Sequence, residues 1–114
     1  GKIWITAFNP LAIFLVDPSD KYTIVHKFRV QLPRLHGLAR VQDGIWCAHT
    51  TDNVIVKYDI DTGAEKDRIT LDPDDAYVHG LSIKDGELWY GDANFGGKHN
   101  TATTGQPEIG KIVA

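Results

Sequence analysis

Two of the five histidines occupy the same place in a repeated tripeptide. His36-Gly37-Leu38 recurs as His79-Gly80-Leu81, about 43 residues later in the chain. A neutral imidazole can donate one hydrogen bond, accept another, or bind a divalent metal ion through a ring nitrogen. Two imidazoles brought together could therefore hold a metal ion or contact an anionic ligand.

The repeat extends beyond the tripeptide. A tryptophan follows each of these histidines after ten residues, at Trp46 and Trp89, and Trp4 precedes Trp46 by 42 residues. In the first two repeats an aspartate ends an apolar segment 13 residues after the tryptophan, at Asp17 and Asp59. A period of 40 to 50 residues is typical of stacked or radial repeat architectures.

The segments within each repeat have the composition of β-strands. They are short and rich in Val, Ile, Tyr and Trp, with turn residues between them. Asp43-Gly44 and Asp85-Gly86 are strong hairpin signals. No stretch of a dozen residues keeps the 3.6-residue period of an amphipathic helix. The sequence therefore predicts an all-β chain of about ten strands, with four antiparallel strands in a complete repeat. The repeat units fall at about 1–42, 43–85 and 86–114, within one partial domain that spans residues 1–114.

Four antiparallel strands in a repeat of this length are typical of a blade of a β-propeller. The His-Gly-Leu strands suit the innermost position, because glycine allows backbones to approach closely around an axis. The charged fourth strand suits the outer edge, where charges protect an unpaired strand against aggregation. Ten strands amount to about two and a half blades. We therefore expect the propeller to be completed by further blades of a longer chain or by self-association into an oligomer.

Three segments resemble the blades of the NHL-repeat and virginiamycin B lyase-like propellers, and more distantly those of the gluconolactonase superfamily. These segments are Pro33–Leu38, Asp43–Ala48 and Lys57–Gly63. The resemblance covers almost the whole chain and implies a propeller fold. That fold carries lactonases, lyases, peptide-processing enzymes and interaction modules. In the enzymes, the resemblance implies an active site around the central axis on one face, commonly with a divalent metal ion.

Propeller topology places the start of each innermost strand and each loop between the second and third strands on the same face. We expect that face to carry the candidate ligand-binding residues, which are His36, His79, His49, Asn53, Asp92, Asn94 and Phe95. His36 and His79 are the candidate metal ligands, since imidazole is a preferred ligand of Zn²⁺. In the alternative interpretation, a repeated histidine hydrogen-bonds the backbone of a neighbouring blade and fixes the packing. No local metal motif such as HExxH is present.

Other aromatic and imidazole side chains are placed by the same topology. Phe8, like Phe95, falls in or beside a loop of the candidate face, so both could contact a ligand. His26 falls on an outer strand and is predicted to be a surface residue.

The segment 93–107 departs from the repeat, because the equivalent loop in the preceding repeat, at 50–54, is about five residues long. Its residues are mostly small and polar, with several glycines. Long loops without secondary structure in compact domains are usually functional or disordered. We expect this segment to bind a ligand or to act as a lid, and the alternative is a tolerated surface insertion.

The composition is that of a globular domain, with 42% hydrophobic and 24% charged residues. The net charge of −3 and the lack of a basic block argue against nucleic acid or an anionic membrane surface as a partner. No apolar run approaches the length of a membrane span. The single cysteine, Cys47, cannot form an internal disulfide and is predicted to be a small buried residue.

Two functional hypotheses follow from these observations. The first is a non-catalytic propeller module that binds a ligand or a protein through the channel face and the 93–107 loop. No nucleophile–base pair or paired carboxylates stand out in the sequence, which favours this hypothesis. The second is a metal-assisted lyase or lactonase. In that case His36 and His79, with His49 as an optional third ligand, would hold the ion, which would polarise a carbonyl group or activate water.

Overall fold

The computed structural model describes residues 1–72, 75–92 and 108–113. These residues form ten β-strands and one short 3-10 helix, and no α-helix occurs among them. All strand pairs are antiparallel, and they are divided among three sheets. The prediction of an all-β chain of about ten strands is therefore confirmed. No helix in the described part of the chain is long and apolar enough to cross a membrane.

Each sheet is formed by strands that follow one another directly in the chain. The first sheet contains β1 (Ile3–Phe8), β2 (Leu11–Asp17) and β3 (Thr23–Arg29). The second sheet contains β4 (Leu35–Val41), β5 (Gly44–His49), β6 (Val54–Tyr58) and β7 (Glu65–Thr70). The third sheet contains β8 (Val78–Lys84), β9 (Glu87–Asp92) and β10 (Ile109–Ile112). A 3-10 helix, η1 (Pro18–Asp20), lies between β2 and β3.

Local turn chemistry explains where two of the hairpins bend. Asp85 and Gly86 join β8 to β9 with positive φ angles of 54° and 77°. Two successive residues with positive φ form the type I′ turn that matches the twist of the flanking strands. Between β6 and β7, the Asp59 carboxylate accepts hydrogen bonds from the backbone N–H groups of Asp61 and Thr62, both at 2.9 Å. Such a local bond favours a turn over a continued strand.

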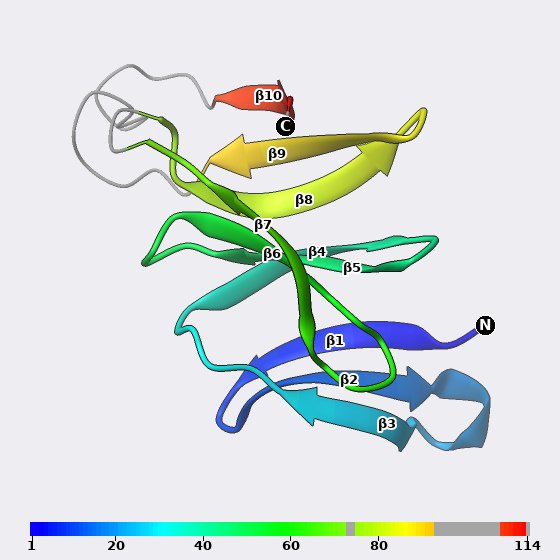
Figure 1. The fold of residues 1–114 in the computed structure, drawn as a ribbon. Coiled ribbons are helices and arrows are strands. Elements are labelled where there is room, and N and C mark those ends of the chain that lie inside the picture. Colours follow the sequence, from blue (N-terminus) through cyan, green and yellow to red (C-terminus); the bar gives the residue numbers. More distant parts are fainter. Residues whose placement is uncertain (73–74, 93–107, 114) are drawn as a thin grey trace.

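The three sheets are stacked in the order of the chain, and β4 lies against both β1 and β8 (Figure 1). One buried cluster between the first and second sheets includes Ile13, Phe28, Ile45 and Val56. A second cluster between the second and third sheets includes Ala39, Ala48, Ile55, Val78 and Leu88. Trp4 packs against the first cluster and Trp46 against the second. Each of these two tryptophans therefore faces the next sheet along the chain.

The closest approach between two sheets occurs at Gly37 in β4. A Cβ atom at this position would lie 2.5 Å from the backbone oxygen of His79 and 2.8 Å from the Cα of Gly80. Only glycine allows this contact, because no real Cβ atom lies so close to backbone atoms. The close approach that the sequence predicts for this glycine is confirmed. At the equivalent Gly80, a Cβ would meet nothing within 4 Å.

Candidate functional site

The structure brings the two repeated histidines together. His36 lies near the start of β4 and His79 near the start of β8, and their rings are stacked. The ring centroids are 4.0 Å apart and the ring planes differ by 27°. The packing of β8 against Gly37 allows this contact, because it brings the backbones of the two strands together beside the rings.

An open pocket of about 370 Å³ lies beside the stacked rings. We call it the imidazole pocket. It is lined by Thr6, Ala7, Phe8, Leu35, His36, Gly37 and His79. The Phe8 ring meets the His36 ring edge-on, with centroids 5.2 Å apart. The Thr6 hydroxyl donates a hydrogen bond of 3.1 Å to the carbonyl oxygen of His36, which links β1 to β4. The pocket therefore combines an apolar wall with two imidazoles.

Partial burial lowers the pKa of His36 below the ordinary value of 6.5, and the nearby charges of His79 and Arg34 lower it further. The imidazole of His36 is therefore mainly neutral at pH 7. A neutral imidazole offers one N–H donor and one nitrogen acceptor. The position of His36 in the pocket makes it suited to hydrogen bonding with an uncharged or anionic ligand.

The stacked arrangement does not form a chelate for one metal ion. The lone pair of an imidazole nitrogen lies in the plane of its ring, and here the rings are stacked with an angle of 27° between their planes. The lone pairs of stacked rings do not converge on one ion unless a ring rotates. Within the described ranges, no group of three or more His, Cys, Asp or Glu side chains is placed to hold a metal ion.

His49 does not join the imidazole pocket. It is the last residue of β5, and its side chain is fully buried. Its Nδ1 is 3.1 Å from the carbonyl oxygen of Leu32, and its Nε2 is 2.7 Å from the Tyr58 hydroxyl. Both ring nitrogens are thus engaged by the protein, and burial lowers the pKa of the ring. His49 therefore contributes to the core, and the prediction that it contacts a ligand stays a prediction.

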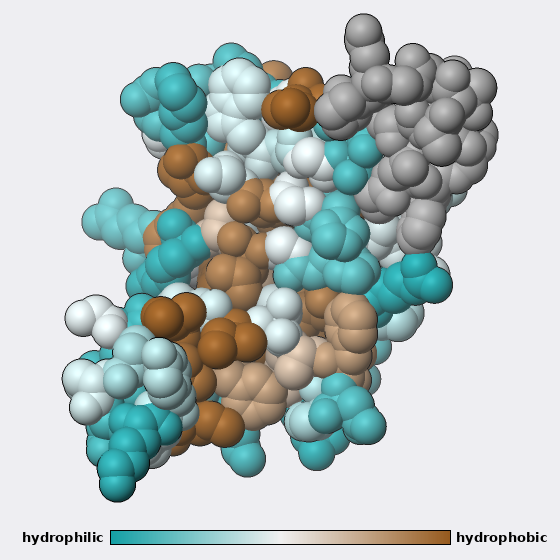
Figure 2. Space-filling view, turned by 180° about the vertical axis from the view of Figure 1, so that it is seen from behind, coloured by the Kyte–Doolittle hydropathy of each residue, from teal (hydrophilic) through white to brown (hydrophobic). Residues whose placement is uncertain are grey.

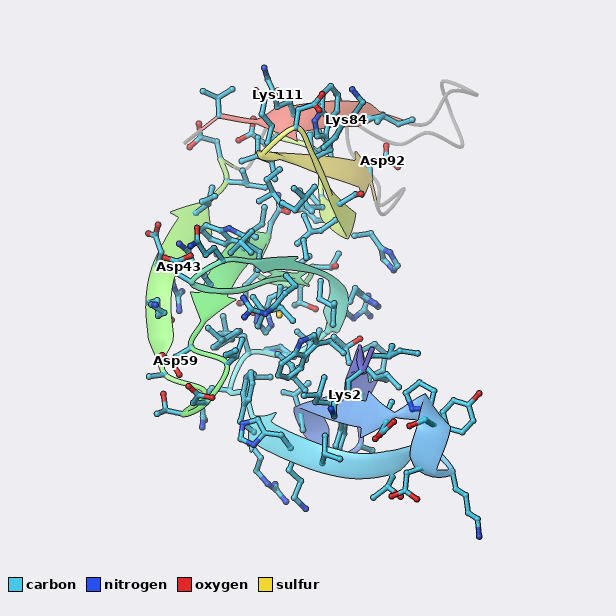
Figure 3. All side chains as sticks on the ribbon, turned by 90° about the vertical axis from the view of Figure 1, so that its right-hand side faces the viewer. Lys2, Asp43, Asp59, Lys84, Asp92 and Lys111 are labelled. Atoms are coloured by element: carbon cyan, nitrogen blue, oxygen red, sulfur yellow. The ribbon has the colours of Figure 1, made fainter. Side chains whose placement is uncertain are left out.

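Asn53 and Asp92 are also engaged in holding the structure together. The buried Asn53 side chain donates to the carbonyl oxygen of Ala76 and accepts from the N–H of Val78, both at 3.0 Å. These bonds fix the segment that leads into β8. Asp92, at the end of β9, accepts a hydrogen bond of 3.1 Å from the backbone N–H of Glu108, beside β10 (Figure 3). Neither residue lines the imidazole pocket.

Three further predictions concern the remaining aromatic and loop residues. Phe8 does lie at the candidate face, in contact with His36. His26 is half-buried rather than exposed, and its Nε2 is enclosed without a hydrogen-bond partner. Asn94, Phe95 and the whole 93–107 segment lie outside the described residues.

Sequence reasoning missed Thr6, Ala7 and Leu35 as lining residues of the pocket. These are small or apolar residues with no chemical signature of their own. They become part of the site only because β1 lies against β4. One feature of the sequence did point to this part of the pocket, namely the aromatic side chain of Phe8 next to the turn at Asn9-Pro10.

No protein-family model and no curated protein matches this chain.

Proposed function

We propose that the three sheets are successive blades of a β-propeller and that the chain is a non-catalytic module that binds a small ligand in the imidazole pocket. The repeated sheet-to-sheet packing supports the propeller. In both contacts between sheets, a repeated tryptophan, Trp4 in β1 or Trp46 in β5, packs against the buried cluster that the following sheet shares. The meander of consecutive antiparallel strands within each sheet is also that of a propeller blade. The imidazole pocket lies where the strands nearest to the presumed axis meet.

The stacked His36–His79 pair beside an open pocket is the observation that carries the proposed function. A pocket of about 370 Å³ is within the usual range for small-molecule sites. Ala7, Phe8 and Leu35 provide apolar surface, and the imidazoles provide hydrogen-bond donors. This combination fits a small molecule with an apolar body and an acceptor oxygen, such as a carboxylate.

The lyase or lactonase hypothesis has less support. The two candidate metal ligands are stacked rather than convergent, and His49 is engaged by Leu32 and Tyr58. The hydroxyl of Thr6, which is the only hydroxyl among the lining residues described for the pocket, donates to the backbone of His36. Binding therefore requires fewer changes in the observed arrangement than catalysis.

A titration with benzoate tests the proposed site. Benzoate combines an apolar ring with a carboxylate, and benzyl alcohol is a neutral probe of similar shape. In protein with isotope-labelled histidines, we expect benzoate to shift the ring signals of His36 and His79 in a saturable manner. Benzyl alcohol should bind more weakly, because it lacks the charged acceptor. The ring of His26 provides an internal control, since it lies in the first sheet next to Phe28.

The variant His79→Ala completes the experiment. His79 is exposed, so its truncation is expected to leave the fold intact. The benzoate-induced shift of His36 should become weaker in this variant. The proposal is wrong if benzoate produces no saturable shift at either imidazole, or if it shifts His26 equally.

A further inference from the structure

The repeat allows one position to be compared in all three sheets. We call the face that carries the tryptophan the front face of a sheet and the opposite side its back face. On the front face, Ile13, Ile55 and Ile109 are equivalent, because each pairs with the residue two positions after the tryptophan. Ile13 and Ile55 are both 0% exposed, whereas Ile109 is 71% exposed. The front face is thus covered in the first two sheets and uncovered in the third, among the described residues.

The back faces show the opposite trend. Ile3, Ile45 and Leu88 are equivalent, because each directly precedes the tryptophan of its sheet. Ile3 is 48% exposed, whereas Ile45 is 0% and Leu88 8% exposed. Ile5 of the first sheet is 42% exposed, but its equivalent, Cys47, is buried. Figure 2 shows hydrophobic surface in a band along the middle of the molecule, which reaches down to the level of the first sheet.

The glycines of the repeat give an independent indication. Gly37 is in contact with the backbone of β8, whereas its equivalent, Gly80, faces open space. A small residue with nothing beside it is unexpected in a strand, because glycine weakens a strand unless another backbone approaches it. At Gly80, the side that faces away from β4 can accept the backbone of a further strand.

The charged residues on the front face of the third sheet do not oppose such a contact. Lys111 forms an ion pair of 2.8 Å with Glu87 (Figure 3 labels Lys111). The equivalent Lys57 of the second sheet pairs with Asp43 at 3.1 Å and lies 5.2 Å from the centre of the Trp46 ring. Lys57 thus keeps its ion pair in a sheet whose front face is covered. Lys111 can do the same.

We propose that the front face of the third sheet binds the back face of the first sheet of a second copy of this chain. The chain itself shows the geometry twice, since its first front face is covered by the second sheet and its second front face by the third. The two uncovered faces are therefore the two complementary sides of the same contact. Such a head-to-tail contact is heterologous, and it produces a ring if the rotation closes or a longer oligomer if it does not.

This inference rests on the repeated packing of the sheets and not on what binds in the imidazole pocket. A failure of benzoate to bind would not contradict the proposed contact between two copies of the chain. Conversely, a monomeric chain could still bind benzoate.

Two substitutions on opposite faces test the contact. Ile109→Glu places a charge on the front face of the third sheet, and Ile5→Glu places one on the back face of the first. Both side chains are exposed within one chain, so both variants should fold, which thermal unfolding will check. Tyr22→Glu is the matched control, because Tyr22 is an exposed aromatic residue in the turn before β3, outside both faces.

Sedimentation equilibrium gives the mass of each protein over a range of concentrations. We expect the wild type and Tyr22→Glu to form assemblies of two or more chains. Each interface variant alone should be monomeric, because every head-to-tail contact needs both faces. An equimolar mixture of the two variants should form a dimer, since each retains the face that the other lacks. A monomeric wild type, or a mixture of the two folded variants that stays monomeric while the wild type associates, would overturn the proposal.

Discussion

The second and third sheets have equivalent residues at many positions but differ in how far these residues are buried. Ile55 and Gly37 of the second sheet are covered by the third, whereas their equivalents, Ile109 and Gly80, face outward. The same side-chain type at the same register thus serves as core in one sheet and as surface in the other. Burial in a repeat chain is therefore decided by the neighbouring sheet rather than by the pattern of the strand itself.

Truncation of the two equivalent isoleucines should have the largest effect. Ile55→Ala removes fully buried atoms and leaves a cavity, so we expect a loss of about 2–5 kcal/mol in the free energy of unfolding. Ile109→Ala removes exposed atoms and should change it by no more than about 0.5 kcal/mol. Urea unfolding at a concentration where the chain is monomeric measures both values. Equal losses for the two variants would show that the sheets are not packed as described.

The strand architecture could be predicted from particular residues. The spacing from tryptophan to aspartate and the Asp85-Gly86 turn define hairpins locally, so strand order follows without knowledge of distant contacts. The role of Gly37 was also predictable, because a glycine at a repeated strand position indicates close approach of another backbone. Which side of that glycine would be covered depends on the stacking of the sheets, and the sequence does not encode this locally.

The candidate site was predicted only in part. His36 and His79 were identified by their repetition, but their stacking depends on how β4 meets β8. The burial of His49 was not predictable, because Cys47, Ala48 and His49 are all buried and β5 shows no alternation that would reveal which side chains point into the core. The partner of His49, the Tyr58 hydroxyl, depends on the pairing of β5 with β6, which is a tertiary property.

The histidines should also make stability depend on pH, with a smaller effect than the core truncation. The pKa values of His36 and His49 are lowered in the folded protein, mainly by burial. The unfolded chain therefore binds more protons than the folded one as the pH falls through the ordinary histidine value of 6.5. Stability is fully present above that value, falls as the pH drops through it, and continues to fall until the lower folded pKa values are reached.

Urea unfolding between about pH 7.5 and about pH 5.5 measures this effect, because the carboxylates titrate mostly below that window. The variant His36→Asn should reduce the pH dependence while keeping a polar side chain in the pocket. A free energy of unfolding that stays constant or rises as the pH falls would contradict the burial of these imidazoles.

The contact between β4 and β8 brings His36 and His79 into one site. Nuclear Overhauser effects between the ring protons of the two histidines are a direct test of this contact. Ring centroids 4.0 Å apart predict clear cross-peaks in the wild type. Gly37→Ala should weaken or abolish them, because its Cβ would collide with the backbone of β8, whereas the control Gly80→Ala should preserve them. Folded wild-type protein without such cross-peaks would show that the two imidazoles are not stacked.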